Sequence, residues 1–101
     1  MPYKLFHKVD AVQPGIMVEL RQAGLQCESV ASVGEDFPDI IVAVPVTDKM
    51  RDAWAWYNLL VELKSEHGQL SDGQRIWHEW WLGPKMTAWS AEDILRYVGR
   101  I

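Results

Sequence analysis

The sequence predicts a single α/β domain in which a small mixed sheet is flanked by helices, in the element order α-β-β-β-α-β-α. Its length of 101 residues provides for only one hydrophobic core. Its contents of 49% hydrophobic and 24% charged residues are typical of a globular protein. Short β-branched runs alternate along the chain with segments of helical periodicity, as in α/β proteins. We therefore expect one domain over residues 1–101, built in two or three layers.

The first expected element is a helix over residues 10–24. Asp10 is a suitable N-cap, and Gly24 is a typical residue at the end of a helix. Ile16 and Leu20 are four residues apart and therefore share one face.

Three strands are expected next. Alternating apolar and polar residues predict a strand over residues 25–33, and β-branched runs predict strands over 39–44 and 58–64. The segment 45–57 between the last two is either a short helix or a continuation of their hairpin. The alternation in Trp54-Ala55-Trp56 favours the hairpin.

The last third of the chain predicts a helix, a short strand and a final helix. Ser71 begins a helix through Leu82, with a Ser-x-x-Gln capping box closed by Gln74. Its apolar stripe comprises Ile76, Trp77, Trp80 and Trp81. The strand covers residues 85–89, and Ser90 caps the final helix, whose apolar residues are Ile94, Leu95 and Val98.

Asp39, Glu62 and Lys64 are the candidate catalytic residues. In an antiparallel pair, the first residue of one strand lies beside the last residues of the other, so Asp39 and Glu62 become neighbours. Glu62 and Lys64 are two residues apart and point to one face, while Val61 and Leu63 point to the other, towards the core. Two carboxylates and one ammonium group therefore converge at one end of the sheet.

Carboxylates in this arrangement suit Mg²⁺ or Mn²⁺, completed by water and by the phosphate oxygens of a substrate. Such an ion polarises a phosphate and lowers the pKa of a bound water, while a lysine stabilises the developing charge. The alternative is that Asp39 is a turn residue and that Glu62 and Lys64 lie on a solvated strand edge. So short a pattern arises by chance, and spacing alone favours this alternative.

Longer motifs surround these residues. They are, in chain order, Gly34, Phe37-Pro38-Asp39-Ile40-Ile41-Val42, Leu60-Val61-Glu62-Leu63-Lys64, Gly68-Gln69-Leu70-Ser71 with Gln74 and Trp77, and Ser90-Ala91-Glu92-Asp93. The ordered set resembles the PD-(D/E)xK nuclease superfamily and, within it, the VRR-NUC group with its stand-alone phage and bacterial members. The resemblance covers roughly residues 10–98.

The resemblance implies a restriction-endonuclease-like core and a role for each matching residue. Asp39 and Glu62 would bind the metal, and Lys64 would assist catalysis. Gln74 would approach the site from the helix that follows. Gln74 also closes the expected capping box, and the two roles are compatible.

The first helix departs from the family pattern. Phage relatives often begin with D-A-x-Q-x-E, whereas this chain has Asp10-Ala11-Val12-Gln13-Pro14-Gly15. Gly15 therefore occupies the place of an acidic residue. Asp10, Gln13 and Glu19 are the candidates for replacing it, and the departure puts metal affinity in doubt.

These features predict a Mg²⁺- or Mn²⁺-dependent DNA endonuclease. The resemblance further implies branched or junction DNA as a substrate. A homodimer is expected on separate grounds, because so small a domain buries a limited fraction of its surface and the chain has six tryptophans. A net charge of -4 and a pI near 5.2 argue against a nucleic-acid partner. Together with the missing acid, they favour a catalytically inactive member that binds DNA or protein. A third alternative is a structural dimerisation module.

The tryptophan residues allow two interpretations. Lys49, Arg51, Trp54 and Trp56 lie in the segment between the second and third strands, where they could contact DNA. Packing in the core or in a dimer is the favoured interpretation, as it is for Trp77, Trp80, Trp81 and Trp89.

The remaining expectations concern the compartment. Cys27 is the single cysteine, so no intramolecular disulfide can form, and we expect it to be a buried apolar residue. No apolar run is long enough to cross a bilayer, so no membrane partner is expected. We expect a cytoplasmic protein of a bacterium or a phage-infected cell.

Overall fold

The computed structural model describes residues 12–46 and 55–101. The elements are α1 (Gln13–Gln22), β1 (Gln26–Ser29), the 3-10 helix η2 (Ala31–Val33), β2 (Ile40–Pro45), β3 (Trp56–Leu63), α2 (Asp72–Trp80), β4 (Lys85–Ala88) and α3 (Ala91–Tyr97). The strands form one mixed sheet in the order β1-β2-β3-β4, in which only β4 pairs in parallel, with β3. The predicted α/β class and order of helices and strands are confirmed.

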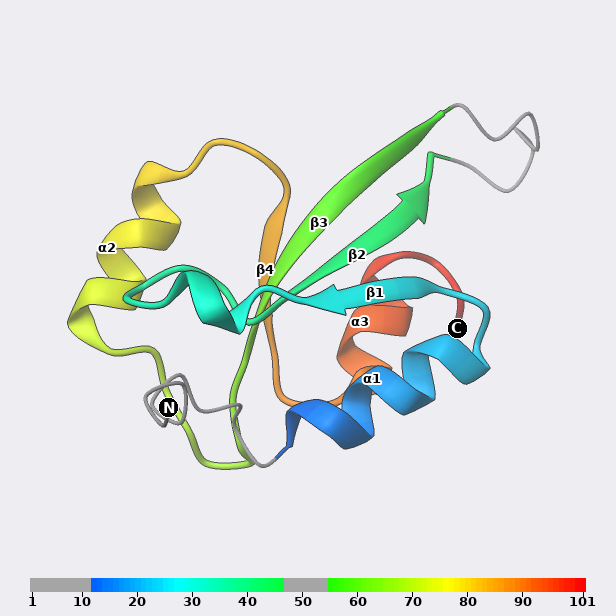
Figure 1. Cartoon of the computed structure of the whole chain (residues 1–101), viewed down its shortest axis with the longest axis horizontal. Helices are drawn as coiled ribbons and strands as arrows, with labels where there is room; N and C mark the ends of the chain where they lie inside the picture. The colour runs from blue at the N-terminus through cyan, green and yellow to red at the C-terminus, as the bar shows by residue number, and fades with distance from the viewer. Residues whose placement is uncertain (1–11, 47–54) are drawn as a thin grey trace.

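One face of the sheet forms the hydrophobic core with α1 and α3. Alternate residues of the two central strands are buried on this face, namely Ile40, Val42, Val44, Leu59, Val61 and Leu63. They pack with Ile16, Met17 and Leu20 of α1 and with Ala91 and Ile94 of α3. Figure 1 shows both helices below the strands. This side of the molecule therefore has the two-layer form expected for a small α/β domain.

The opposite face is partly open to solvent. Gln26, Glu28 and Asn58 are exposed there, and their register places Ile41 and Ala43 on the same face. A groove of about 610 Å³ lies over this part of the sheet, lined by Arg21, Gly24, Leu25, Gln26, Cys27, Glu28, Ile41, Ala43 and Asn58. Neither expected metal ligand lines it.

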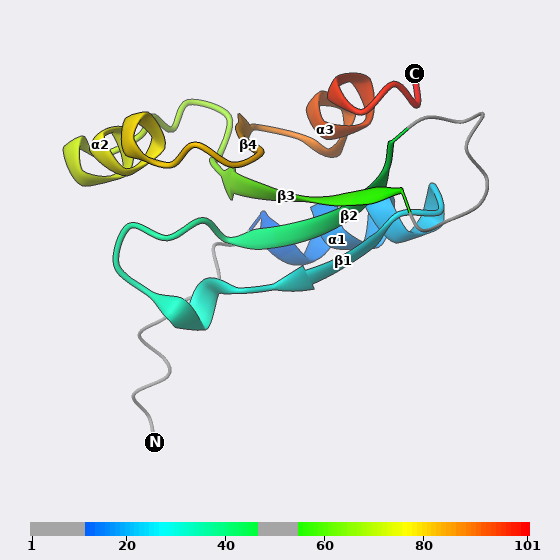
Figure 2. The ribbon, with the colours of Figure 1, turned by 90° about the horizontal axis from the view of Figure 1, so that it is seen from above.

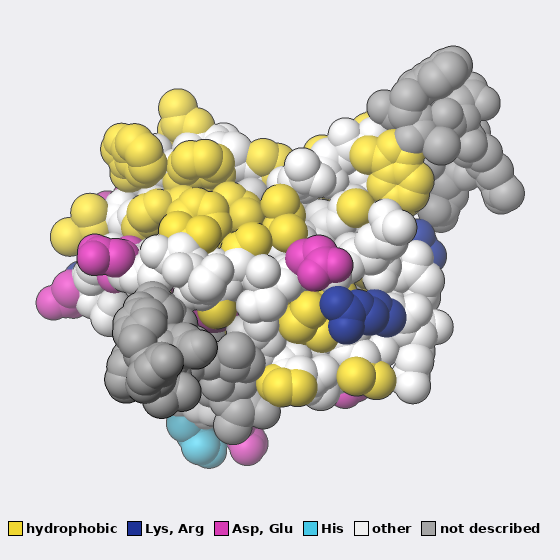
Figure 3. All heavy atoms as spheres, in the orientation of Figure 1, with side chains coloured by type: hydrophobic (Ala, Val, Ile, Leu, Met, Phe, Trp, Pro, Cys, Tyr) yellow, Lys and Arg dark blue, Asp and Glu magenta, His cyan; other side chains and the backbone are white. Residues whose placement is uncertain are grey.

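Helix α2 lies beyond one end of the sheet, apart from α1 and α3 (Figures 1 and 2). None of its residues is buried. Its apolar side chains form much of the hydrophobic surface that Figure 3 shows over this end of the molecule. The predicted stripe exists, but Ile76 and Trp80 are not part of the chain's own core.

Most element boundaries differ by one or two residues from those predicted, and three of the differences have a clear local cause. The second element pairs only over Gln26–Ser29, because the chain then turns into η2, where the Ala31 N–H donates to Ser29 Oγ. Helix α1 begins at Gln13 with Val12 as its N-cap and without a side-chain cap, and Asp10 lies outside the described residues. Helix α2 ends at Trp80 because Trp81 is already extended.

The hairpin between β2 and β3 continues further than its β-branched runs, as the alternation predicted. Pro45 pairs with Trp56, and the Val46 N–H donates to the Ala55 carbonyl at 2.7 Å. Lys49, Arg51 and Trp54 lie outside the described residues, so their contacts stay predictions.

Cys27 is a free, buried thiol, as predicted. Its burial raises the pKa of the thiol, because the charged thiolate is disfavoured away from water. None of the described helices is long and apolar enough to cross a membrane.

Candidate active site

The pairing of β2 with β3 brings Asp39 beside Glu62. The register pairs Ile40 with Val61, so one residue further along it sets Asp39 opposite Glu62. The Asp39 N–H donates to the Val61 carbonyl at 3.0 Å. Its carboxylate Oδ2 accepts a hydrogen bond from the Leu63 N–H at 2.8 Å. Asp39, directly before β2, therefore lies beside the end of β3 that carries Glu62, as the hairpin predicted.

Glu62 is buried, although it lies on the face opposite the hydrophobic core. Its exposed fraction is 3%, and its Oε2 is 3.9 Å from the Nζ of Lys64. Backbone pairing of the Lys64 N–H with the Ala88 carbonyl, at 2.9 Å, fixes the base of the lysine side chain. A buried carboxylate is costly unless it has hydrogen bonds or an opposite charge nearby. The lysine and the acid are therefore placed to stabilise each other.

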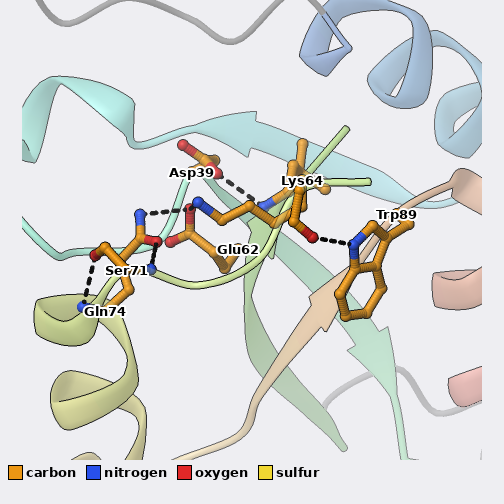
Figure 4. Close-up of polar contacts among 8 residues, drawn as sticks. Asp39, Glu62, Lys64, Ser71, Gln74 and Trp89 are labelled. Carbon is orange, nitrogen blue, oxygen red and sulfur yellow. Dashed lines mark hydrogen bonds and ion pairs between the residues drawn. The ribbon is translucent and has the colours of Figure 1, made fainter. Parts of the chain in front are cut away.

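Gln74 reaches this site from the first turn of α2. Its Nε2 donates to Glu62 Oε2 at 3.1 Å. Figure 4 shows the side chains of Asp39, Glu62, Lys64 and Gln74 gathered around the end of β3. The structure thus brings together all four residues that the sequence predicted for the centre of the site.

The first-helix candidates do not add a third carboxylate among the described residues. Gln13 is only 1% exposed, its Nε2 lies 3.6 Å from Met17 Sδ, and its Oε1 has no hydrogen-bond partner in the described structure. Glu19 is exposed, and its side chain forms no hydrogen bond or ion pair with the four described site residues. Asp10 is outside the described ranges.

The donor set fits a partly hydrated divalent ion. No group of three or more His, Cys, Asp or Glu within residues 12–46 and 55–101 is placed to hold a metal ion. Mg²⁺ commonly takes one or two carboxylates and completes its shell with water and phosphate oxygens. A carboxylate has about four lone-pair positions, more than the one hydrogen bond that Asp39 accepts from the Leu63 N–H uses. Asp39 and Glu62 therefore suit a Mg²⁺ or Mn²⁺ ion whose remaining ligands are water molecules. They do not suit a metal that takes all of its ligands from the protein.

A contact that the sequence did not predict joins the loop before β2 to α2. A Cβ added to Gly73 would lie 2.6 Å from both carboxylate oxygens of Asp36. Next to it, the rings of Phe37 and Trp77 meet edge to face with centroids 5.5 Å apart. The loop that leads to Asp39 is thus packed against the helix that carries Gln74. The available signal was Gly73 itself, because glycine in a helix is unfavourable unless close packing requires it.

Trp56 lies away from the site. It begins β3, whereas Glu62 is near its end, so about 20 Å of strand separates them at roughly 3.3 Å per residue. Its side chain is exposed, and its expected contact with DNA or a second subunit stays a prediction.

No family model matches this sequence, and neither a curated protein nor a solved structure matches it. The chemistry of the site must therefore be argued from its own residues and from the motifs in the sequence.

Proposed function

We propose that this protein is a metal-dependent endonuclease that hydrolyses DNA phosphodiester bonds with Mg²⁺ or Mn²⁺. The observation that carries the proposal is that Asp39 is bonded to Val61 and Leu63, on either side of Glu62, while Lys64 lies near Glu62 and Gln74 is bonded to it. The order α-β-β-β-α-β-α and the motif resemblance support a restriction-endonuclease-like core. On the same resemblance, the proposal extends to branched DNA as the substrate of the expected homodimer.

Each side chain has a defined task in this proposal. Asp39 and Glu62 would hold the ion, which when bound supplies positive charge to the phosphate and a water of lowered pKa. Lys64 donates to a non-bridging phosphate oxygen and stabilises the negative charge that develops there. The Leu63 backbone N–H holds the Asp39 carboxylate, and the Gln74 side-chain Nε2 donates to that of Glu62. The acids are thus oriented before substrate binds.

A second candidate function is DNA or protein binding without cleavage. Two observations favour it: the described residues provide two acids and no third, and the chain has a net charge of -4. Fewer acidic ligands weaken the hold on a divalent cation, and a negative chain repels DNA phosphates. This alternative keeps the site geometry but assigns it no reaction.

Cleavage assays separate the two functions. Supercoiled, flap and four-way-junction DNA would be incubated with Mg²⁺, with Mn²⁺ and with EDTA. We expect metal-dependent cleavage that falls at least about 100-fold in Asp39→Asn and in Glu62→Gln, since the ion contributes several kcal/mol of charge stabilisation. Both substitutions preserve side-chain shape, and circular dichroism would confirm folding.

Glu28→Gln is the matched control, because Glu28 is an exposed acid on the same face of the sheet and lines the separate groove. Its cleavage rate should equal that of the wild type. Full activity in both site variants would contradict the proposal. If the protein binds a DNA substrate but cuts it with neither metal, the result would favour binding without cleavage.

A further inference from the structure

Ser71 and Gln74 form a closed pair of hydrogen bonds at the start of α2. The Gln74 backbone N–H donates to Ser71 Oγ at 3.1 Å, and the Ser71 N–H donates to the Gln74 side-chain Oε1 at 2.9 Å. This is a capping box, which satisfies two backbone N–H groups that a helix start leaves without partners. The same glutamine donates to Glu62 through its Nε2.

The capping box determines which end of the Gln74 amide faces Glu62. Because Oε1 accepts from Ser71, Nε2 points away from the helix start and towards the carboxylate. The reversed amide would set NH₂ against the Ser71 N–H and a carbonyl oxygen against the Glu62 carboxylate. Both contacts would then be repulsive, so the two hydrogen bonds select a single orientation.

We propose that Ser71 is a positioning residue for the nuclease site, acting through Gln74. The inference rests on the proposed function and adds a residue and a role to it. One Gln74 N–H donates to Glu62, and the second has no partner among the described residues. That second N–H is placed to donate to a phosphate oxygen of the bound strand. Ser71 holds the helix turn and the amide in the orientation that makes both donations possible.

Two substitutions separate helix capping from positioning. Ser71→Ala removes the hydroxyl that accepts from the Gln74 backbone N–H, so the first turn of α2 loosens. The backbone N–H at position 71 is retained, so the amide gains mobility through the loosened turn and not through loss of its own hydrogen bond. Gln74→Glu retains a capping box, because a glutamate oxygen accepts from the Ser71 N–H as well as an amide oxygen does. It removes the N–H donors and places a second carboxylate against Glu62. Ser71→Thr is the conservative control, since threonine also caps helices.

The first readout is the mobility of the Gln74 side-chain NH₂ group, measured by ¹⁵N relaxation in the whole chain. We expect a rigid group in the wild type and in Ser71→Thr. In Ser71→Ala its order parameter should fall towards that of the exposed Gln69 side chain. An amide that stays equally rigid in Ser71→Ala would overturn the inference.

The second readout is kcat for DNA cleavage in a double-mutant cycle. We expect Ser71→Ala and Gln74→Ala each to lower kcat roughly tenfold, the effect of one lost hydrogen bond to a charged group. Gln74→Glu should lower kcat at least as much while α2 retains its helicity. Adding Ser71→Ala to Gln74→Ala should change nothing further, because Ser71 acts only through Gln74. A further loss in the double variant would refute positioning.

The two failures are distinguishable. If the wild type cuts no DNA with either metal, the proposed nuclease function fails, and the NH₂ mobility alone then decides whether Ser71 orients Gln74.

Discussion

Gly73 occupies a position where a side chain would collide with a neighbouring loop. Alanine is intrinsically more favourable than glycine in a helix by about 1 kcal/mol. At Gly73, however, a Cβ would lie 2.6 Å from the Asp36 carboxylate, so the Asp36 side chain must move. We expect Gly73→Ala to lower the free energy of unfolding by about 1–2 kcal/mol, as overpacking does. Denaturant unfolding measures this change.

Gly15→Ala is the matched control for Gly73→Ala. No atom lies within 4 Å of a Cβ added to Gly15, so alanine there should stabilise α1. In an Asp36→Ala background the clash is absent, and Gly73→Ala should lose its cost. Equal effects of alanine at both glycines would show that the contact with Asp36 has no energetic role.

His78 predicts a pH dependence of stability. Burial lowers the pKa of this histidine below the ordinary value of 6.5, and the nearby Lys85 ammonium lowers it further. The unfolded chain therefore takes up a proton at higher pH than the folded chain does. The stability that neutral His78 contributes is therefore fully present above pH 6.5. It is lost as the pH falls from 6.5 through the lowered pKa that His78 has in the folded state.

Denaturant unfolding between pH 7.5 and 5 would reveal this decline. In His78→Gln the part of the decline that begins near pH 6.5 should disappear. His67→Gln, in the exposed loop after β3, is the control and should leave the decline unchanged. A wild-type stability that rises as the pH falls through this range would contradict the assignment.

At the scale of elements, the sequence predicted those features that depend on nearby residues. The Ser71 capping box depends on a spacing of three residues, and the Asp39–Glu62 neighbourhood depends on one hairpin. Both are found in the structure. The contact of Asp36 with Gly73 joins segments far apart in sequence, and no local pattern encodes such an approach.

The early end of β1 and the exposure of α2 were harder to predict for different reasons. The alternation after Ser29 continues in the sequence, but the pairing extends by only one bond, from the Val30 N–H to the Asp39 carbonyl at 2.8 Å, before the chain turns into η2. An apolar stripe on a helix shows that the helix needs a partner, not that the partner belongs to the same chain. Trp80 illustrates this, since it is 68% exposed.

Helix α1 offers a direct test of the missing acid. Gly15 is the third residue of α1, where glutamate suits both helix propensity and the positive end of the helix dipole. The open space around Gly15 accepts the side chain, so we expect Gly15→Glu to stabilise the fold by about 1 kcal/mol. Under the proposed nuclease function, a third acid would strengthen the binding of the ion, so we also expect tighter Mn²⁺ binding and faster cleavage.

Gly15→Gln separates the two effects. It matches the size and helix propensity of glutamate but adds no charge. Isothermal titration with Mn²⁺ and cleavage assays would compare the two variants. If they bind Mn²⁺ and cut DNA equally, an acid at this position contributes nothing to the metal centre.

At the scale of the whole molecule, the hydrophobic surface over α2 is the most unusual feature of the exterior. Ile76 is 63% exposed, Trp80 is 68% exposed and Leu82 is 94% exposed. Figure 3 shows a continuous hydrophobic surface over this end of the molecule. The rings of Trp77 and Trp81 stack at the same end of α2 with centroids 5.2 Å apart. Contiguous exposed apolar surface in a small protein commonly marks an interaction site.

We predict that this surface forms the expected homodimer, with Trp80 near its centre. A tryptophan removed from an interface centre typically costs at least about 2 kcal/mol, so Trp80→Ser should raise the Kd for dimerisation by roughly 30-fold or more. Analytical ultracentrifugation over a concentration series measures that constant. Trp56→Ser is the matched control, because Trp56 is also exposed but lies at the far end of β3. If the wild type sediments as a monomer at every concentration, the predicted dimer does not form. If Trp56→Ser dissociates as readily as Trp80→Ser, the interface does not lie at Trp80.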